Sequence, residues 1–143
     1  MRLAFHKVFT VSSLERNLFF EAWVISFFAR LRLIFTPFSS YSQKLGKHNF
    51  LPEEIINCDT DLVLLIKRSI KRAVAYSIWR NKCLEQSVTA KKMLKKRGII
   101  STIYFGVRKT NNELEAHAWV KIGDSFVVGE RNHETFTVVA YYT

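Results

Sequence analysis

A chain of 143 residues with 48% hydrophobic residues, five Gly and two Pro has the composition of one ordinary folded domain, which excludes disordered and low-complexity proteins. Its two cysteines, Cys58 and Cys83, are too few for the disulfide framework of a small secreted protein. The 22 Lys and Arg residues outnumber the 12 Asp and Glu residues, and the net charge of +10 favours an acidic partner such as nucleic acid, anionic lipid, or an acidic peptide or protein.

The first predicted element is a helix that begins after Ser12 and ends before Pro37. Ser12-x-x-Glu15 is a capping box, in which each side chain satisfies an amide of the first turn. Pro37 pushes Thr36 out of helical geometry and so ends the helix. Apolar residues recur at three- and four-residue spacing through 18–35, as expected of a helix buried on a broad face.

The same stretch, 18–35, is the most hydrophobic part of the chain and is the candidate for a membrane span. A span needs about 20 mostly apolar residues, and Glu21, Arg30 and Arg32 interrupt this run. No small-residue cleavage site follows the charged N-terminus, so no targeting segment is predicted. We therefore expect a soluble, cytoplasmic protein. The alternative is a Phe-rich helix that lies on a membrane surface or in a partner's groove.

A polar stretch, 38–50, is predicted to be a loop or linker. It divides the chain into an N-terminal helical region with its linker, 1–50, and a second domain, 51–143. Pro52 followed by Glu53 and Glu54 favours a short helical turn at the start of that domain.

Two further helices are predicted in the second region. One begins at Asp59 or Thr60 and carries an apolar face at helical spacing, with basic residues on its other side. The other runs from about Cys83 to Arg97 and ends at Gly98, a residue favoured just beyond a helix end.

After Gly98 the apolar period changes to two, which predicts strands. We expect strands over 99–107, 114–122, 126–128 and 135–142, with turns at 110–113 and 123–125. Helices followed by an antiparallel meander define an α+β fold class.

Cys83 and His117 are the candidate catalytic pair. Cys83 lies at a predicted helix start, where unpaired amides and the helix dipole favour a thiolate, and His117 lies in mid-strand between two alanines that leave room for an imidazole. The third group is expected to be Glu130, after the next strand, rather than Asp124 in the turn. Against this stands the interpretation of Cys83 as a small buried hydrophobe and of His117 as an ordinary strand residue.

The remaining polar and aromatic candidates carry weaker signals. Gln86 is a polar contact one turn into the helix, and Trp119 and Trp79 line a substrate groove or belong to the core. The scattered His6, His48 and His133 have no metal-ligand spacing with Cys58, so neither a metal nor a cofactor is predicted. Basic helix faces are usually solvated, and no nucleic-acid partner is expected.

Four blocks together carry a resemblance to a known family. In chain order they are Cys83-Leu84-Glu85-Gln86-Ser87, Met93-Leu94-Lys95-Lys96-Arg97-Gly98-Ile99, Gly106-Val107-Arg108 and Glu115-Ala116-His117-Ala118-Trp119-Val120. Their order and spacing, within 61–139, resemble the transglutaminase-like cysteine peptidases of lasso-peptide biosynthesis, in their stand-alone B2 form. The aromatic-rich region 18–38 also resembles the N-terminal part of that family.

The resemblance implies a transglutaminase- or papain-like core with a Cys-His-acid triad, in which Cys83 is the nucleophile and His117 the base. The family usually has Asp after the strand that follows the His, whereas this chain has Val127-Val128-Gly129-Glu130, one residue longer and with Glu in place of Asp. The implied function is removal of the leader from a ribosomally made precursor peptide. The implied partners are a separate small leader-binding protein (B1 type) and an ATP-dependent lasso cyclase.

Two other function classes remain open at the level of sequence. A transglutaminase-like acyltransferase or amidase would use the same two residues but deliver the acyl group to an amine. A non-catalytic basic module would bind nucleic acid or an acidic protein in a salt-sensitive way, independently of Cys83 and His117.

Overall fold

The computed structural model of the chain describes residues 12–52 and 58–143. Glu53 and Glu54, expected in a helical turn after Pro52, lie outside the described residues. The elements, in chain order, are α2 (Ser13–Phe35), α3 (Phe38–Ser42), α4 (Thr60–Tyr76), α5 (Cys83–Lys95), β1 (Thr102–Thr110), β2 (Glu113–Ile122), β3 (Ser125–Val128), a short 3-10 helix (His133–Thr135) and β4 (Thr137–Tyr142). The α+β prediction is confirmed.

The starts of α2 and α4 follow the predicted capping residues. Only the Ser12 half of the predicted capping box forms, because the Glu15 carboxylate lies 3.7 Å from Arg72 instead. The Ser12 side chain accepts a hydrogen bond from the Glu15 amide at 3.3 Å, and Asp59 accepts from the amides of Asp61 and Leu62. These bonds satisfy first-turn amides that have no partner within the helix. At the other end of α2, Thr36 is in extended geometry before Pro37, as predicted.

The prediction of a loop over 38–50 is wrong for its first five residues, which form α3. The ring of Phe38 packs edge-on against that of Phe105 in β1, with centroids 5.1 Å apart, and Tyr41 is 2% exposed. Phe38 and Tyr41, three positions apart, lie on one face of a helical turn. Tyr41 is buried, whereas Phe38 stays 45% exposed while its ring contacts the sheet.

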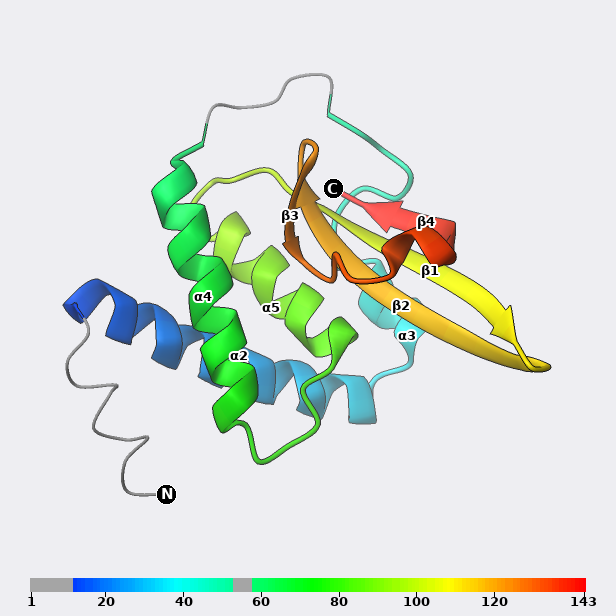
Figure 1. Cartoon of the computed structure of the whole chain (residues 1–143), viewed down its shortest axis with the longest axis horizontal. Coiled ribbons are helices and arrows are strands. Elements are labelled where there is room, and N and C mark those ends of the chain that lie inside the picture. Colours follow the sequence, from blue (N-terminus) through cyan, green and yellow to red (C-terminus); the bar gives the residue numbers. More distant parts are fainter. Residues whose placement is uncertain (1–11, 53–57) are drawn as a thin grey trace.

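The four strands form one antiparallel sheet in the order β3-β2-β1-β4. The predicted meander is therefore wrong for β4, which pairs with β1 instead of β3. Gly129 follows β3 with φ of +79°, a backbone geometry that glycine adopts without strain, and it turns the chain out of the sheet. The 3-10 helix then leads to the far edge of the sheet (Figure 1).

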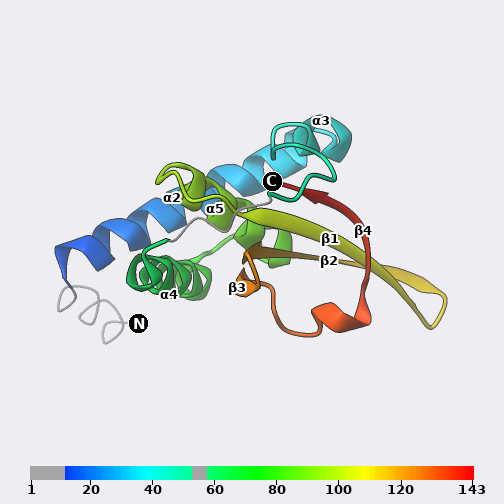
Figure 2. The ribbon, with the colours of Figure 1, turned by 90° about the horizontal axis from the view of Figure 1, so that it is seen from above.

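α5 is the central helix of the molecule, since it packs against α2 and α4 on one side and against β1, β2 and β3 on the other. Figure 2 shows α2, α4 and α5 gathered at one end, α3 beside the sheet, and the β1–β2 hairpin extending away at the other end. The core joins both halves and includes Leu18 and Ala22 of α2, Ile66 and Ile70 of α4, Val88 and Met93 of α5, and Ile103 and Val120 of the sheet. The division of the chain after residue 50 stays a prediction.

None of the helices in the described part of the chain has the length and apolarity needed to cross a membrane.

Candidate active site

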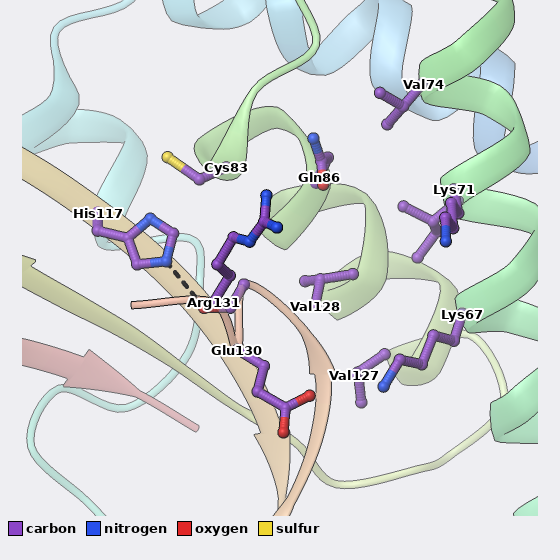
Figure 3. Close-up of a pocket in the computed structure, with 12 residues that line it drawn as sticks. Lys67, Lys71, Val74, Cys83, Gln86, His117, Val127, Val128, Glu130 and Arg131 are labelled. Atoms are coloured by element: carbon purple, nitrogen blue, oxygen red, sulfur yellow. Dashed lines mark hydrogen bonds between the residues drawn. The ribbon is translucent and has the colours of Figure 1, made fainter. Parts of the chain in front are cut away.

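Cys83 and His117 line one cavity of about 620 Å³ between the helices and the sheet. Cys83 is the first residue of α5, and His117 lies in the middle of β2, opposite Gly106 of β1. Figure 3 shows the thiol and the imidazole on the same side of this cavity, reached from the two different layers. Two residues that are 34 positions apart in the sequence are thus brought to one place.

The start of α5 is held by a buried carboxylate. Glu85 is 3% exposed and accepts a hydrogen bond from the Lys82 amide at 3.1 Å, while Arg30 of α2 lies 3.4 Å from its other oxygen. Gln86 donates to the carbonyl of Asn81 at 2.9 Å, which fixes the segment entering the helix. These bonds set the position from which the Cys83 side chain projects.

The imidazole of His117 is packed among rings on the sheet face. Its centroid lies 5.1 Å from that of Phe136 and 5.7 Å from that of Trp119. Gly106 makes this packing possible, because a Cβ at that position would lie 2.8 Å from Phe136 Cβ and 2.9 Å from the Trp119 ring. His117 and Trp119 share one face, as the strand alternation predicts.

The Nε2 atom of His117 lies 2.8 Å from the carbonyl oxygen of Gly129. A carbonyl only accepts hydrogen bonds, so Nε2 carries a proton, and in the neutral ring Nδ1 then has a free lone pair. Figure 3 shows this second nitrogen on the side of the ring that faces Cys83. The ring is therefore held in the tautomer that a base for a thiol requires, although no hydrogen bond joins Cys83 to His117 in the described structure. Such bonds often form only in the substrate complex.

Neither acidic candidate, Glu130 or Asp124, contacts the imidazole of His117. Glu130 lines the cavity but is exposed, and its carboxylate points away from His117 (Figure 3). Asp124 is fully exposed in its turn, where it lies 3.7 Å from Lys121. The main-chain carbonyl of Gly129 occupies the place expected for the third group. The assignment of Glu130 as the third group stays a prediction. The one sequence signal for the carbonyl is the glycine, Gly129, that follows a predicted strand.

The three weaker candidates are placed differently. Gln86 lines the cavity. Trp119 is 3% exposed and lies parallel to Tyr104, with 5.7 Å between ring centroids, so it is a core residue beside His117. Trp79 is not brought to the cavity. It packs against α2, 4.9 Å from the ring of Trp23 and 5.1 Å from that of Phe27.

Three cations that the sequence did not single out also line the cavity. Lys67 and Lys71 come from α4, and Arg131 comes from the segment after β3. The spacing of α4 shows only that its basic residues lie on the face opposite the buried one. That this face meets position 131 depends on the packing of α4 beside β3.

A thiol at a helix start and an imidazole on an antiparallel sheet are the kinds of group that cysteine-dependent acyl transfer uses as nucleophile and base. The family model described as the transglutaminase-like superfamily matches residues 28–141. Because this match covers most of the chain, the protein belongs to the transglutaminase-like superfamily, whose members are typically cysteine-dependent enzymes. Searches of curated proteins and of solved structures returned no match.

Proposed function

We propose that the protein is a cysteine peptidase that removes the leader from a ribosomally made lasso-peptide precursor. One observation carries the enzymatic part of this proposal: Cys83 and His117 share a cavity, and His117 is held with its proton on the nitrogen bound to Gly129. The four sequence blocks around these residues support the precursor as the substrate.

In the proposed reaction, Nδ1 of His117 takes the thiol proton of Cys83, and the sulfur attacks the carbonyl carbon of the last leader residue. The resulting tetrahedral oxyanion is stabilised by first-turn amides of α5, which have no partner within the helix. His117 then gives its proton to the departing amine. The core peptide leaves with a free N-terminus, and the leader remains as a thioester on Cys83.

In the second half of the reaction, water attacks the thioester carbonyl while His117 takes its proton. The carbon–sulfur bond breaks, the thiol is restored, and the leader departs with a new carboxylate. We propose that a separate small leader-binding protein presents the precursor to this site, and that an ATP-dependent cyclase closes the ring on the core peptide.

The test is a cleavage assay with a precursor peptide and its leader-binding protein, followed by mass spectrometry. Cys83→Ala is expected to abolish cleavage, because no other thiol lines the cavity in the described structure. Cys58→Ala is the matched control and is expected to retain cleavage within about threefold, as for a substitution away from the site. Equal circular dichroism spectra would establish that both variants fold. Cleavage by Cys83→Ala would refute the proposal.

Transglutaminase-like acyl transfer is the second candidate, because the superfamily match fits both outcomes. The two differ in what resolves the thioester. Running the assay in ¹⁸O-labelled water with an added primary amine separates them: hydrolysis places one ¹⁸O in the leader carboxylate, whereas acyl transfer yields an unlabelled leader amide.

A further inference from the structure

The cavity that contains Cys83 and His117 is lined by three cations, Lys67, Lys71 and Arg131, and by one carboxylate, that of Glu130. Figure 3 shows Arg131 extending from the end of β3 toward Cys83 and Gln86, while the two lysines project from α4 on the opposite side. The cations therefore line one cavity from two elements, and all three residues are exposed.

These cations have no acidic partner in the described part of the chain. Lys67 donates to the carbonyl of Phe126 at 3.2 Å, which leaves its charge unbalanced. Lys71 and Arg131 are in no ion pair or hydrogen bond among the described residues. By contrast, Arg97 is paired with Glu21 at 2.7 Å. Like charges held around one cavity repel each other, and a bound anion relieves that repulsion.

The apolar part of the cavity wall consists of Ile70, Val74, Val127 and Val128, and Gln86 and Gly129 also belong to the lining. An acidic side chain matches this combination, because its methylene groups pack on the apolar wall while its carboxylate reaches the cations. Arg131 extends toward Cys83 in Figure 3, so an acidic side chain bound to it would lie on the Cys83 side of the cavity.

We infer that Arg131 and Lys71, with Lys67, form a subsite that binds an Asp or Glu side chain of the peptide substrate close to the scissile bond. This inference rests on the proposed function for its substrate, a peptide, but the charge preference of the cavity can be measured without it.

The first test compares two alkylating reagents of nearly equal size, iodoacetate and neutral iodoacetamide. Their rate ratio at Cys83 is expected to exceed the ratio at Cys58, which serves as the control within the same molecule. Arg131→Gln and Lys71→Gln are each expected to lower the ratio at Cys83 by about three- to fivefold, the effect of one nearby charge in a partly hydrated site. Lys109→Gln, which removes an exposed cation outside the cavity, leaves it unchanged.

The second test uses a matched pair of reversible thiol ligands, acetyl-Glu-Gly-aldehyde and acetyl-Gln-Gly-aldehyde, as protectants of Cys83 against iodoacetamide. The Glu compound is expected to protect at a concentration at least about threefold lower, and Arg131→Gln abolishes the difference. The advantage shrinks as salt is raised, because salt screens charges at the cavity mouth.

The two proposals fail in different ways. If the iodoacetate preference is the same at Cys83 and Cys58, or unchanged in Arg131→Gln and Lys71→Gln, the acidic subsite is refuted. If His117→Ala leaves the iodoacetamide rate at Cys83 unchanged, the catalytic pair is refuted while the iodoacetate-to-iodoacetamide ratio still measures the subsite.

The charge-reversing substitution Arg131→Glu gives a further check. It should make Cys83 react faster with the cationic reagent 2-bromoethylamine than with iodoacetate, relative to the native protein, and failure to do so counts against the subsite.

Discussion

At the scale of single residues, the imidazole of His117 is supported by the carbonyl of Gly129 and not by a carboxylate. Both groups fix the tautomer, because both accept from Nε2–H. They differ in charge: in the proposed reaction, a carboxylate would also stabilise the imidazolium formed when His117 takes the thiol proton, whereas a carbonyl contributes only its dipole. We therefore expect the proposed activity to depend on the position of the ring more than on a third charge.

The substitution Glu130→Gln tests this difference. Because the Glu130 carboxylate points away from His117, we expect the substitution to leave the rate of Cys83 alkylation and of precursor cleavage within about threefold of the native rate. Glu134→Gln, in the nearby 3-10 helix, is the matched control. A loss of about a hundredfold in the Glu130 variant alone would show that this carboxylate moves onto the imidazole during the reaction.

The geometry of Gly129 leads to a second prediction. Its φ is +79°, and a Cβ there would lie 2.5 Å from the carbonyl oxygen of Ala118. Gly129→Ala therefore has both a strained backbone and a steric clash, and we expect it to destabilise the fold by about 2–3 kcal/mol and to displace the carbonyl from His117. Urea unfolding and Cys83 alkylation measure the two effects.

Gly98→Ala is the matched control for this substitution. Its φ is +68°, but nothing lies within 4 Å of a Cβ at that position. Only the backbone cost of about 1 kcal/mol is expected, with no change at Cys83. If both alanine variants alter Cys83 equally, the carbonyl of Gly129 has no special role.

At the scale of elements, α2 has two faces of nearly equal apolarity but very different surroundings. Phe19 is 8% exposed and packs edge-on against Tyr76 of α4, with centroids 5.8 Å apart. Phe28, nine positions later, is 55% exposed. A pattern of apolar residues around the whole helix does not reveal which side is covered.

The same substitution on each face measures the contribution of burial. Phe19→Ala is expected to lower the free energy of unfolding by about 3–5 kcal/mol, because it removes a buried ring between two helices. Phe28→Ala removes the same atoms from an exposed position and should change it by less than about 1 kcal/mol. Urea titrations of the two variants under identical conditions make the comparison. Equal losses would mean that the outer face of α2 is covered in solution.

At the scale of the whole molecule, the stability of the fold depends on the titration of a buried amine. Lys91 of α5 is 7% exposed and donates to the carbonyl of Ser101. Burial, with a smaller contribution from the charge of Lys95, lowers the pKa of Lys91 from 10.5 to about 8. The folded state therefore releases this proton at a lower pH than the unfolded chain does.

The stability consequence follows from linkage. Below pH 8 both states hold the proton and the cost of the buried charge is present in full. Between about pH 8 and 10.5 the unfolded state binds more protons, so the free energy of unfolding rises with pH.

Lys91→Met removes the titrating amine. The stability advantage of this variant over the native chain should be largest near pH 7 and shrink by up to about 3 kcal/mol toward pH 10.5. Urea midpoints of both proteins at pH 7 and 10 check this. Parallel pH profiles would contradict it.

The sequence predicted the local elements better than their assembly. Capping residues such as Ser12 and Asp59 locate helix starts, and alternation locates strands, because both signals lie within a few residues of each other. Alternation does not specify a neighbour, so the pairing of β4 with β1 was missed. Within the site, the sequence paired Cys83 with His117 from the chemistry of their side chains, and in the structure both residues line one cavity.

Two features of the site, the Gly129 carbonyl on His117 and the cationic lining of the cavity, could not be predicted from the sequence, each for a physical reason. A main-chain carbonyl exists at every residue, so nothing in the sequence marks the one at Gly129 as a hydrogen-bond partner. The cationic lining combines α4 with residue 131, which come together only when α4 packs beside β3. Both depend on tertiary packing rather than on local pattern.

The carbonyl on His117 also bears on how enzymes of this kind are found. A search for cysteine enzymes that requires three side chains, a thiol, an imidazole and an acid or amide, would reject an arrangement in which the third group belongs to the peptide backbone. Such a search would pass over this chain, and any other whose strand ends with a suitably turned glycine. A geometric template built on two side chains and one oxygen atom of either origin would recover it.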